Sequence, residues 1–257
     1  MLIVRTSPAL SAQVGALVSN LPRAGCDGSI ASDPRLRLSP LEGTISADRA
    51  QSWAYAEDFI AEDPVVLGAR DRAAQLGCYS ILPGGAAALT VLTAAVGARA
   101  VVEVGTGTGV ASLAMLRGMD DDGVLTTIDV EVEHQRAAKK AFAEAGIRAP
   151  RTRTISGRAL DVLPRLTDAA YDLVFVSAAE TSCAAYVDQA LRLLRAGGLL
   201  VVDNALWGGQ VADPARRDPG TTAVRDVGRQ LRDDERVLPA LLPVGDGLLV
   251  AVRRADS

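Results

Sequence analysis

The chain has 257 residues, of which 49% are hydrophobic, 23% charged and 4% aromatic, and its formal net charge is −4. This composition is typical of one globular α/β domain with additional segments and excludes a mostly disordered chain. The negative charge and the few aromatic side chains argue against nucleic acid or an anionic membrane as a partner.

The cysteines and the apolar segments indicate a cytoplasmic protein. Cys26, Cys78 and Cys183 are far apart and lack metal-type spacing, as expected of a reduced protein. Residues 9–21 are interrupted by Ser, Gln and Asn, so we expect no signal peptide. The Ala-rich run 86–96 is too short to cross a bilayer. We therefore expect no membrane partner.

The N-terminal part of the chain differs from the rest. Residues 1–48 have weak periodicity and several Gly, Pro and Ser residues, which predicts an extension that is partly disordered or helical. The main domain is then residues 49–257. It begins with a helical pattern over 49–75, in which Pro64 starts a second helix, and a short helix over 86–96 follows.

Strands and helices alternate after residue 100. The predicted strands cover residues 100–104, 124–128, 152–155, 173–176 and 199–202. The predicted helices between and after them cover residues 111–117, 133–145, 160–166, 184–195 and 222–231. This alternation predicts a parallel sheet covered by helices on both faces. Two apolar stretches that flank Gly245-Asp246-Gly247 predict a final hairpin, so the last strand should be antiparallel to its neighbour.

The strongest motif is "VVEVGTGTGVAS" at 101–112, which joins the first strand to a helix through Gly105, Gly107 and Gly109. Glycines let the backbone turn tightly and a ligand approach closely; the alternative is an ordinary strand-to-helix turn, which three alternating glycines and an acid disfavour. The third glycine of the dinucleotide fingerprint is Val110 here, which disfavours a nicotinamide-dependent oxidoreductase. Glu103 would repel a phosphate and suits a positively charged ligand, such as the amino group or sulfonium of S-adenosylmethionine.

The next two strands end in further candidate cofactor residues. Asp129 ends "VLTTID", where a carboxylate can accept both hydroxyls of a ribose; alternatively it caps the following helix. Val130 would then lie against the adenine. The segment "SGRALDVLP" at 156–164 closes the third strand, and its backbone around Ala159 can reach the adenine edge.

With these motifs together the chain resembles the class I S-adenosylmethionine-dependent O-methyltransferases, and more narrowly the catechol/caffeoyl-CoA O-methyltransferase-like family of actinobacterial type. The resemblance rests on "VVEVGTGTGVASLAML", "DDGVLTTIDVEVEHQRAAKKAFAEAG", "ISGRALDVLPRL", "YDLVFV", "LRAGGLLVVDNALWGGQV" and "LLPVGDGLLVAV". It covers residues 65–253. It implies a Rossmann-like, doubly wound, seven-stranded, mostly parallel sheet with an antiparallel C-terminal strand, and a homodimer.

The resemblance also implies a set of cofactor-binding residues. In this sequence they are Ile81, Glu103, Gly105, Thr106, Gly109, Ala111, Asp129, Val130 and Ala159. Ala111 stands where many relatives have a serine that touches the methionine end of the cofactor. Ser112 is adjacent, but one residue along a helix turns a side chain by about 100°.

The resemblance is incomplete at the metal site. Metal-dependent relatives hold a divalent cation with an Asp-Asn pair, present as Asp203 and Asn204, and with an aspartate whose position is Ser177 here. The lysine that often serves as the base is replaced by Glu180. Asp203 and Asn204 alone would bind Mg²⁺ weakly, so use of a divalent cation stays open. In the simplest alternative, Asp203 caps its loop and Glu180 is solvated.

The sequence therefore predicts an S-adenosylmethionine-dependent O-methyltransferase that acts on a hydroxyl of a small, aromatic acceptor. Ser177, Glu180 and Asp203 are the catalytic candidates on the acceptor side. The alternative is a protein of the same fold that binds S-adenosylmethionine but has lost metal-dependent catalysis. His134, the only histidine, is expected at the surface. Trp207 and Trp53-Ala54-Tyr55 either line an acceptor pocket or pack in the core or a dimer interface.

Overall fold

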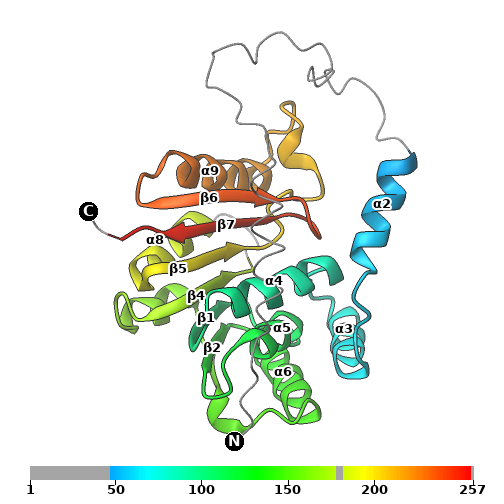
Figure 1. Ribbon diagram of the computed structural model, residues 1–257, viewed down its shortest axis with the longest axis vertical. Coiled ribbons are helices and arrows are strands. Elements are labelled where there is room, and N and C mark those ends of the chain that lie inside the picture. Colours follow the sequence, from blue (N-terminus) through cyan, green and yellow to red (C-terminus); the bar gives the residue numbers. More distant parts are fainter. Residues whose placement is uncertain (1–46, 178–181, 256–257) are drawn as a thin grey trace, which may run out of the picture. The chain divides into compact units, whose positions relative to one another are not determined.

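The computed structural model describes residues 47–177 and 182–255. Glu180 and nearly all of the predicted extension 1–48 lie outside these residues. The described part begins with helix α2 (Ala47–Glu57), followed by α3 (Pro64–Leu76) and α4 (Pro83–Ala95), as the ribbon in Figure 1 shows. The predicted start of a helix at Pro64 is confirmed, because Asp63 caps α3 by accepting the N–H groups of Val65 and Val66.

A seven-stranded sheet forms the centre of the described part. Its strands are β1 (Ala100–Val104), β2 (Val124–Asp129), β3 (Thr152–Ser156), β4 (Tyr171–Val176), β5 (Leu194–Val202), β6 (Val237–Leu242) and β7 (Leu248–Arg253). The strand order is β3-β2-β1-β4-β5-β7-β6. The pairs among β1 to β5 are parallel, whereas β7 is antiparallel to both β5 and β6. The predicted Rossmann-like sheet with an antiparallel C-terminal strand is confirmed.

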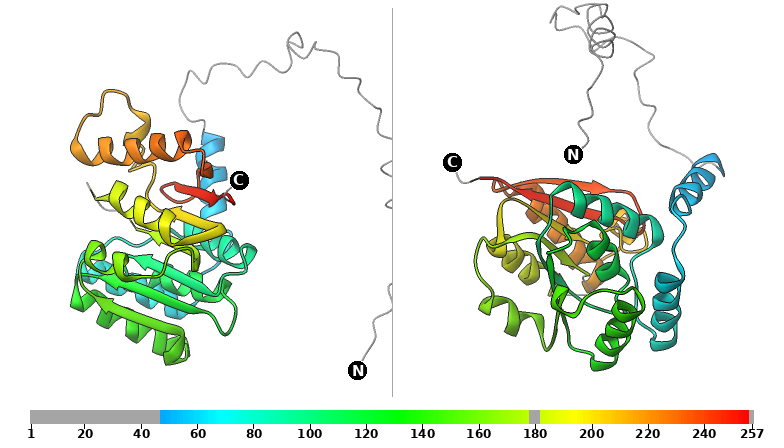
Figure 2. Two further views of the ribbon diagram at one scale, coloured as in Figure 1. Left: turned by 90° about the vertical axis from the view of Figure 1, so that its left-hand side faces the viewer. Right: turned by 60° about the horizontal axis from the view of Figure 1, so that its bottom comes forward.

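Helices cover both faces of this sheet (Figures 1 and 2). They are α5 (Val110–Gly118), α6 (Val132–Glu144), α7 (Ala159–Val162), α8 (Cys183–Leu193) and α9 (Pro219–Asp233), with α3 and α4. Alternate residues of each strand enter separate cores: Val101 packs with α3 to α6, and Val102 packs with α7 to α9. No helix of the described residues has the length and apolar character needed to span a membrane.

One predicted boundary is wrong. Helix α8 ends at Leu193 instead of residue 195, and β5 begins at Leu194, five residues earlier than expected. Leu194 pairs with Tyr171 and Leu199 with Leu173, so the two strands are out of step between these pairs. The extra residues form an irregularity that includes Gly197 in the left-handed region, with a φ of 75°. Glycines that suggested a helix stop therefore lie inside the strand.

Candidate functional site

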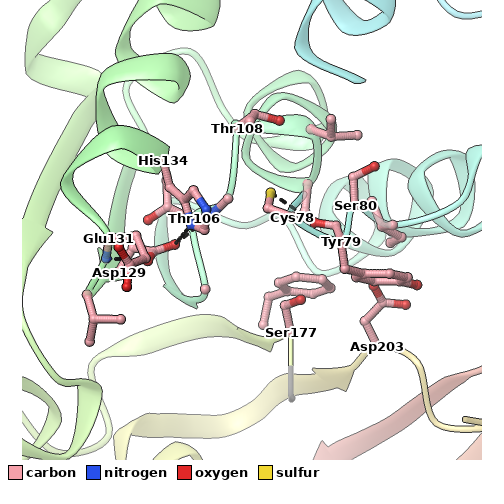
Figure 3. A pocket seen from close by; sticks show the side chains of 17 residues that line it. Cys78, Tyr79, Ser80, Thr106, Thr108, Asp129, Glu131, His134, Ser177 and Asp203 are labelled. Carbon is pink, nitrogen blue, oxygen red and sulfur yellow. Dashed lines mark hydrogen bonds and ion pairs between the residues drawn. The ribbon is translucent and has the colours of Figure 1, made fainter. Parts of the chain in front are cut away.

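A cavity of about 230 Å³ lies beyond the carboxyl ends of β1, β2, β4 and β5, where parallel sheets usually bind ligands (Figure 3). Its wall combines the segment before α4, the glycine loop after β1, the end of β2 and single residues from β4 and β5. The lining residues are Cys78, Tyr79, Ser80, Ile81, Gly105, Thr106, Gly107, Thr108, Val110, Ala111, Asp129, Val130, Glu131, His134, Phe175, Ser177 and Asp203.

The glycine loop forms the floor of this cavity. Gly105, Gly107 and Gly109 all have positive φ angles, of 90°, 50° and 91°, which side-chain-bearing residues rarely adopt. Gly109 also lies against helix α6, since an added Cβ there would be 3.1 Å from the Phe142 ring and 3.2 Å from Ala138. This glycine is needed for the turn and for helix packing rather than for contact with the cavity. Val110 and Ala111, the first two residues of α5, do line the cavity.

Asp129 is oriented by the backbone on both sides. Its Oδ2 accepts the N–H of Gly107 at 2.9 Å, and its Oδ1 accepts the N–H of Glu131 at 2.9 Å. The carboxylate thus joins the glycine loop to the start of α6 and still lines the cavity. The sequence suggested two alternatives for Asp129, a local cap or a ligand-facing carboxylate. The structure combines them, because Asp129 holds the backbone of the loop and also lines the cavity.

Glu103 lies behind the cavity wall. Its side chain is fully buried; Oε2 accepts the hydroxyl of Ser112, and Oε1 has no partner among the described residues. Burial, with a smaller contribution from the negative charge of Asp129, raises the pKa of Glu103 to about 8, although the nearby hydroxyls of Ser112 and Thr127 oppose this shift. Ser112 is thus occupied by this buried acid and does not replace the serine expected at Ala111.

Asp203 and Tyr79 form the other end of the cavity. Asp203 is only 2% exposed; its Oδ1 accepts the N–H of Asn204 at 2.7 Å, and its buried Oδ2 has no hydrogen-bond partner in the described part of the chain. Burial raises the pKa of Asp203 to about 7. The Tyr79 phenol faces this carboxylate (Figure 3), and burial together with Asp203 raises the pKa of the phenol.

Arg70 of α3 fixes the segment that carries Tyr79. Its guanidinium makes two hydrogen bonds of 2.6 Å to the Glu62 carboxylate. The remaining nitrogen, Nη1, donates to the Ile81 carbonyl at 2.6 Å and to the Ser80 hydroxyl at 3.2 Å. A bidentate ion pair of this kind holds one geometry. Arg70 therefore sets the position of residues 79–81 in the cavity wall without lining the cavity itself.

Comparison with known proteins assigns a family to this arrangement. The sequence model of the O-methyltransferase family matches residues 69–254. The chain belongs to the O-methyltransferase family. A Mycobacterium tuberculosis protein named as an O-methyltransferase is 51% identical over 214 residues, which are 83% of this chain and 96% of that protein.

Two solved structures are similar to this methyltransferase. A Corynebacterium glutamicum protein is 36% identical, with a TM-score of 0.75, over 81% of this chain and 98% of its own. The O-methyltransferase TomG of Streptomyces achromogenes, which acts in tomaymycin synthesis and was solved with S-adenosylmethionine, is 30% identical with a TM-score of 0.72. That match covers 80% of this chain and 98% of TomG. The family expected from the motifs is confirmed.

The cavity brings together most of the predicted site residues of the methyltransferase. Those that line it are Ile81, Gly105, Thr106, Ala111, Asp129, Val130, Ser177 and Asp203. Three predicted cofactor residues do not: Glu103 and Gly109 lie behind the wall as described, and Ala159 packs in the core with α7 and α8. Ala159 is the first residue of α7 and is buried, so its methyl group packs in that core. Glu180 lies outside the described residues.

Sequence analysis missed several lining residues. Tyr79, Ser80 and Cys78 follow a helix in a segment without a motif, and only the fold brings them to the glycine loop. His134 was expected at the surface, but its ring lines the cavity beside Asp129. Its spacing of five residues after Asp129 places it in the first turn of α6, close to the end of β2, which is the signal that was available. Of the tryptophans, Trp207 lies against Gly220 and Trp53 is exposed, and neither lines the cavity.

Among the described residues, those at the metal position that the resemblance implies offer few ligands for a divalent cation, and Glu180 lies outside them. The described residues contain no group of three or more His, Cys, Asp and Glu side chains that could hold a metal. Asp203 supplies one carboxylate, of which Oδ1 is already hydrogen-bonded, and Ser177 supplies a neutral hydroxyl. Asn204 does not line the cavity, and its φ of 58° is a backbone conformation in which asparagine is enriched. Mg²⁺ usually takes one or two carboxylates together with several waters, and Asp203 is the one carboxylate at this position among the described residues.

Proposed function

We propose that the protein transfers the methyl group of S-adenosylmethionine to a hydroxyl of a small aromatic acceptor. The observation that carries this proposal is the charge of the cavity. Asp129, Glu131 and Asp203 line it, and none of its described lining residues is Lys or Arg. A pyrophosphate would find no cation there, whereas a ligand with an ammonium and a sulfonium is attracted.

The wall divides into two parts that match the two ends of this cofactor. Asp129 and Val130 take the adenosine, with the ribose hydroxyls on the carboxylate. The methionine part lies over Gly105, Thr106 and Ala111, where the glycine loop lets the cofactor approach the backbone closely. Glu103 contributes from behind the wall, as a buried carboxyl with one unpartnered oxygen. The S-adenosylmethionine bound in TomG, 30% identical to this chain, supports the same choice of cofactor.

The acceptor lies between the methyl group and Asp203. The rings of Tyr79 and Phe175 line this part of the cavity, which suits an aromatic molecule. The acceptor hydroxyl donates a hydrogen bond to Asp203 Oδ2, the buried oxygen that has no partner in the described chain. Its oxygen attacks the methyl carbon, the carbon–sulfur bond breaks, and the electron pair stays on the sulfur of neutral S-adenosylhomocysteine. Asp203 takes the hydroxyl proton, and Ser177 lies beside the reacting groups.

A second candidate function rests on Ser177 and Asn204. Because the described residues do not make the family's cation site, the protein could bind S-adenosylmethionine and methylate nothing. A methyl-transfer assay with radiolabelled cofactor and a panel of phenols and catechols separates the two functions. We expect turnover that survives a chelator, and a loss of at least about 100-fold in kcat for Asp203→Asn. No transfer to any acceptor would favour the binding protein, and turnover restored only by Mg²⁺ would contradict the metal-free step.

A further inference from the structure

His134 is the one histidine of the chain, and its imidazole lies at the nucleoside end of the cavity. Nδ1 is 3.4 Å from Oδ2 of Asp129, and the two side chains are 22% and 9% exposed (Figure 3). The distance is too long for a good hydrogen bond but is within reach of a small rotation of the ring. In the described structure the ring has no other polar partner. The ring therefore lines the cavity with Asp129 as its one polar neighbour among the described residues.

The hydrogen bonds of Asp129 leave space for two more donors. A carboxylate has about four acceptor positions, two on each oxygen. The N–H groups of Glu131 and Gly107 fill one position on Oδ1 and one on Oδ2. One vacant position remains on each oxygen, and two adjacent hydroxyls of a ribose match this pair. The position on Oδ2 is the one next to His134.

A ribose hydroxyl at the remaining position on Oδ2 lies between a hydrogen-bond acceptor, Asp129, and a hydrogen-bond donor, His134. It donates its hydrogen to Asp129 Oδ2, and its own lone pairs are then free to accept from a nearby N–H. The neutral imidazole has one such N–H, and the carboxylate beside Nδ1 favours the tautomer with the hydrogen on that nitrogen. The charged groups at this end of the cavity are Asp129 and Glu131, both acceptors, so His134 is the available side-chain donor among the described lining residues here.

We propose that His134 is a cofactor-binding residue that shares one ribose hydroxyl with Asp129: the hydroxyl donates to the carboxylate and accepts from Nδ1–H of the imidazole. The assignment rests on the proposed use of S-adenosylmethionine and adds a second protein group to nucleoside recognition. It also gives the pocket a preference for an unmodified ribose, because a phosphate on that hydroxyl would meet the carboxylates of Asp129 and Glu131.

Calorimetric titration with S-adenosylhomocysteine tests the assignment. His134→Asn keeps an amide N–H close to the place of Nδ1, whereas His134→Gln places its amide near Nε2 and His134→Ala has no donor. We expect His134→Ala and His134→Gln to weaken binding about tenfold and His134→Asn to stay within about threefold of the natural protein. Arg136→Ala is the matched control, because Arg136 is exposed on the same helix, pairs with Glu133 and does not line the cavity. Its affinity should not change.

The 2′-deoxy and 3′-deoxy analogues of S-adenosylhomocysteine identify the shared hydroxyl. For the analogue that lacks it, His134→Ala should bind as well as the natural protein; for the other analogue the tenfold loss should remain. An equal loss with all three ligands, or an unchanged affinity of His134→Ala, would overturn the assignment while leaving the proposed function in place. Absence of S-adenosylhomocysteine binding to the natural protein would overturn the proposed function and the assignment together.

Discussion

At the scale of single residues, the buried acids Glu103 and Asp203 form no ion pair with Lys or Arg in the described part of the chain. Glu103 is the clearest case, because it is completely buried and its neighbours are the hydroxyls of Ser112 and Thr127 and the negative Asp129. Desolvation without a counter-ion favours the neutral acid. The acid is consequently protonated at neutral pH in the free protein, and its ionisation opposes folding.

This protonation predicts how stability depends on pH. The pKa of Glu103 is about 8 when folded and near 4.5 when unfolded. Between these values the folded state binds the extra proton, so the free energy of unfolding falls as pH rises, by about 1.4 kcal/mol per pH unit. Glu103→Gln removes this contribution. Urea unfolding of both proteins without cofactor, from pH 5 to pH 8, should show the natural protein losing stability relative to the variant. Asp203 is present in both proteins, so its contribution to the pH dependence cancels in the comparison. If the free energy of unfolding changes with pH in parallel for the two proteins, the raised pKa of Glu103 is refuted.

At the scale of elements, the cavity wall is held together by contacts between segments that are distant in sequence. The Glu57 carboxylate at the end of α2 accepts the N–H of Gly84 in the first turn of α4 at 2.8 Å and the N–H of Gly245 at 2.7 Å. The residue before α4, Leu82, offers no side-chain cap, so Glu57 supplies it from another helix. This contact fixes the helix that follows residues 79–81 of the wall.

Removal of this cap should lower stability measurably. We expect Glu57→Ala to reduce the free energy of unfolding by about 1–3 kcal/mol, since two backbone N–H groups lose their acceptor. Glu133→Ala removes an exposed partner of Arg136 and should cost less than about 0.5 kcal/mol. Denaturant unfolding of the two variants gives the comparison, and equal costs would show that Glu57 is not a cap.

The glycine loop provides a second prediction at this scale. Gly109→Ala places a side chain on a residue with positive φ and pushes its Cβ against Phe142 and Ala138. Gly146→Ala also places a side chain on a residue with positive φ, of 68°, but its Cβ has open space around it. Gly109→Ala should therefore cost about 1–3 kcal/mol more than Gly146→Ala. Thermal and urea unfolding measure this difference. If the two variants are equally stable, α5 and α6 are not packed through this glycine.

At the scale of the whole molecule, the sequence was sufficient for the sheet and for several strand-end residues that line the cavity. Asp129 and Asp203 were expected at one place because Asp129 ends β2 and Asp203 follows β5, and such ends meet at one edge of a parallel sheet. Glu103 was placed in the cavity because a one-dimensional pattern does not show that Ser112 holds its side chain inside the core. Tyr79 was missed because only the fold, through Arg70, brings its segment to the cavity, whereas His134 was missed because its spacing after Asp129 was not used.

The homodimer inferred from the family resemblance stays a prediction. Tyr55 of α2 and Phe59 after it are 71% and 67% exposed, and their rings contact each other. Such rings are typical of surfaces that another protein covers. Light scattering should give twice the chain mass of 26.7 kDa, and Tyr55→Asp with Phe59→Asp should give the single-chain mass. A natural protein that is already monomeric would refute this prediction.

The central claim is that the cavity accepts a cationic adenosine cofactor rather than a dinucleotide. Calorimetric titration of the natural protein with S-adenosylmethionine, S-adenosylhomocysteine and NAD⁺ tests it most directly. We expect micromolar binding of the first two compounds, as is common for enzyme ligands, and no detectable binding of NAD⁺. Binding of NAD⁺ with none of S-adenosylmethionine would contradict it.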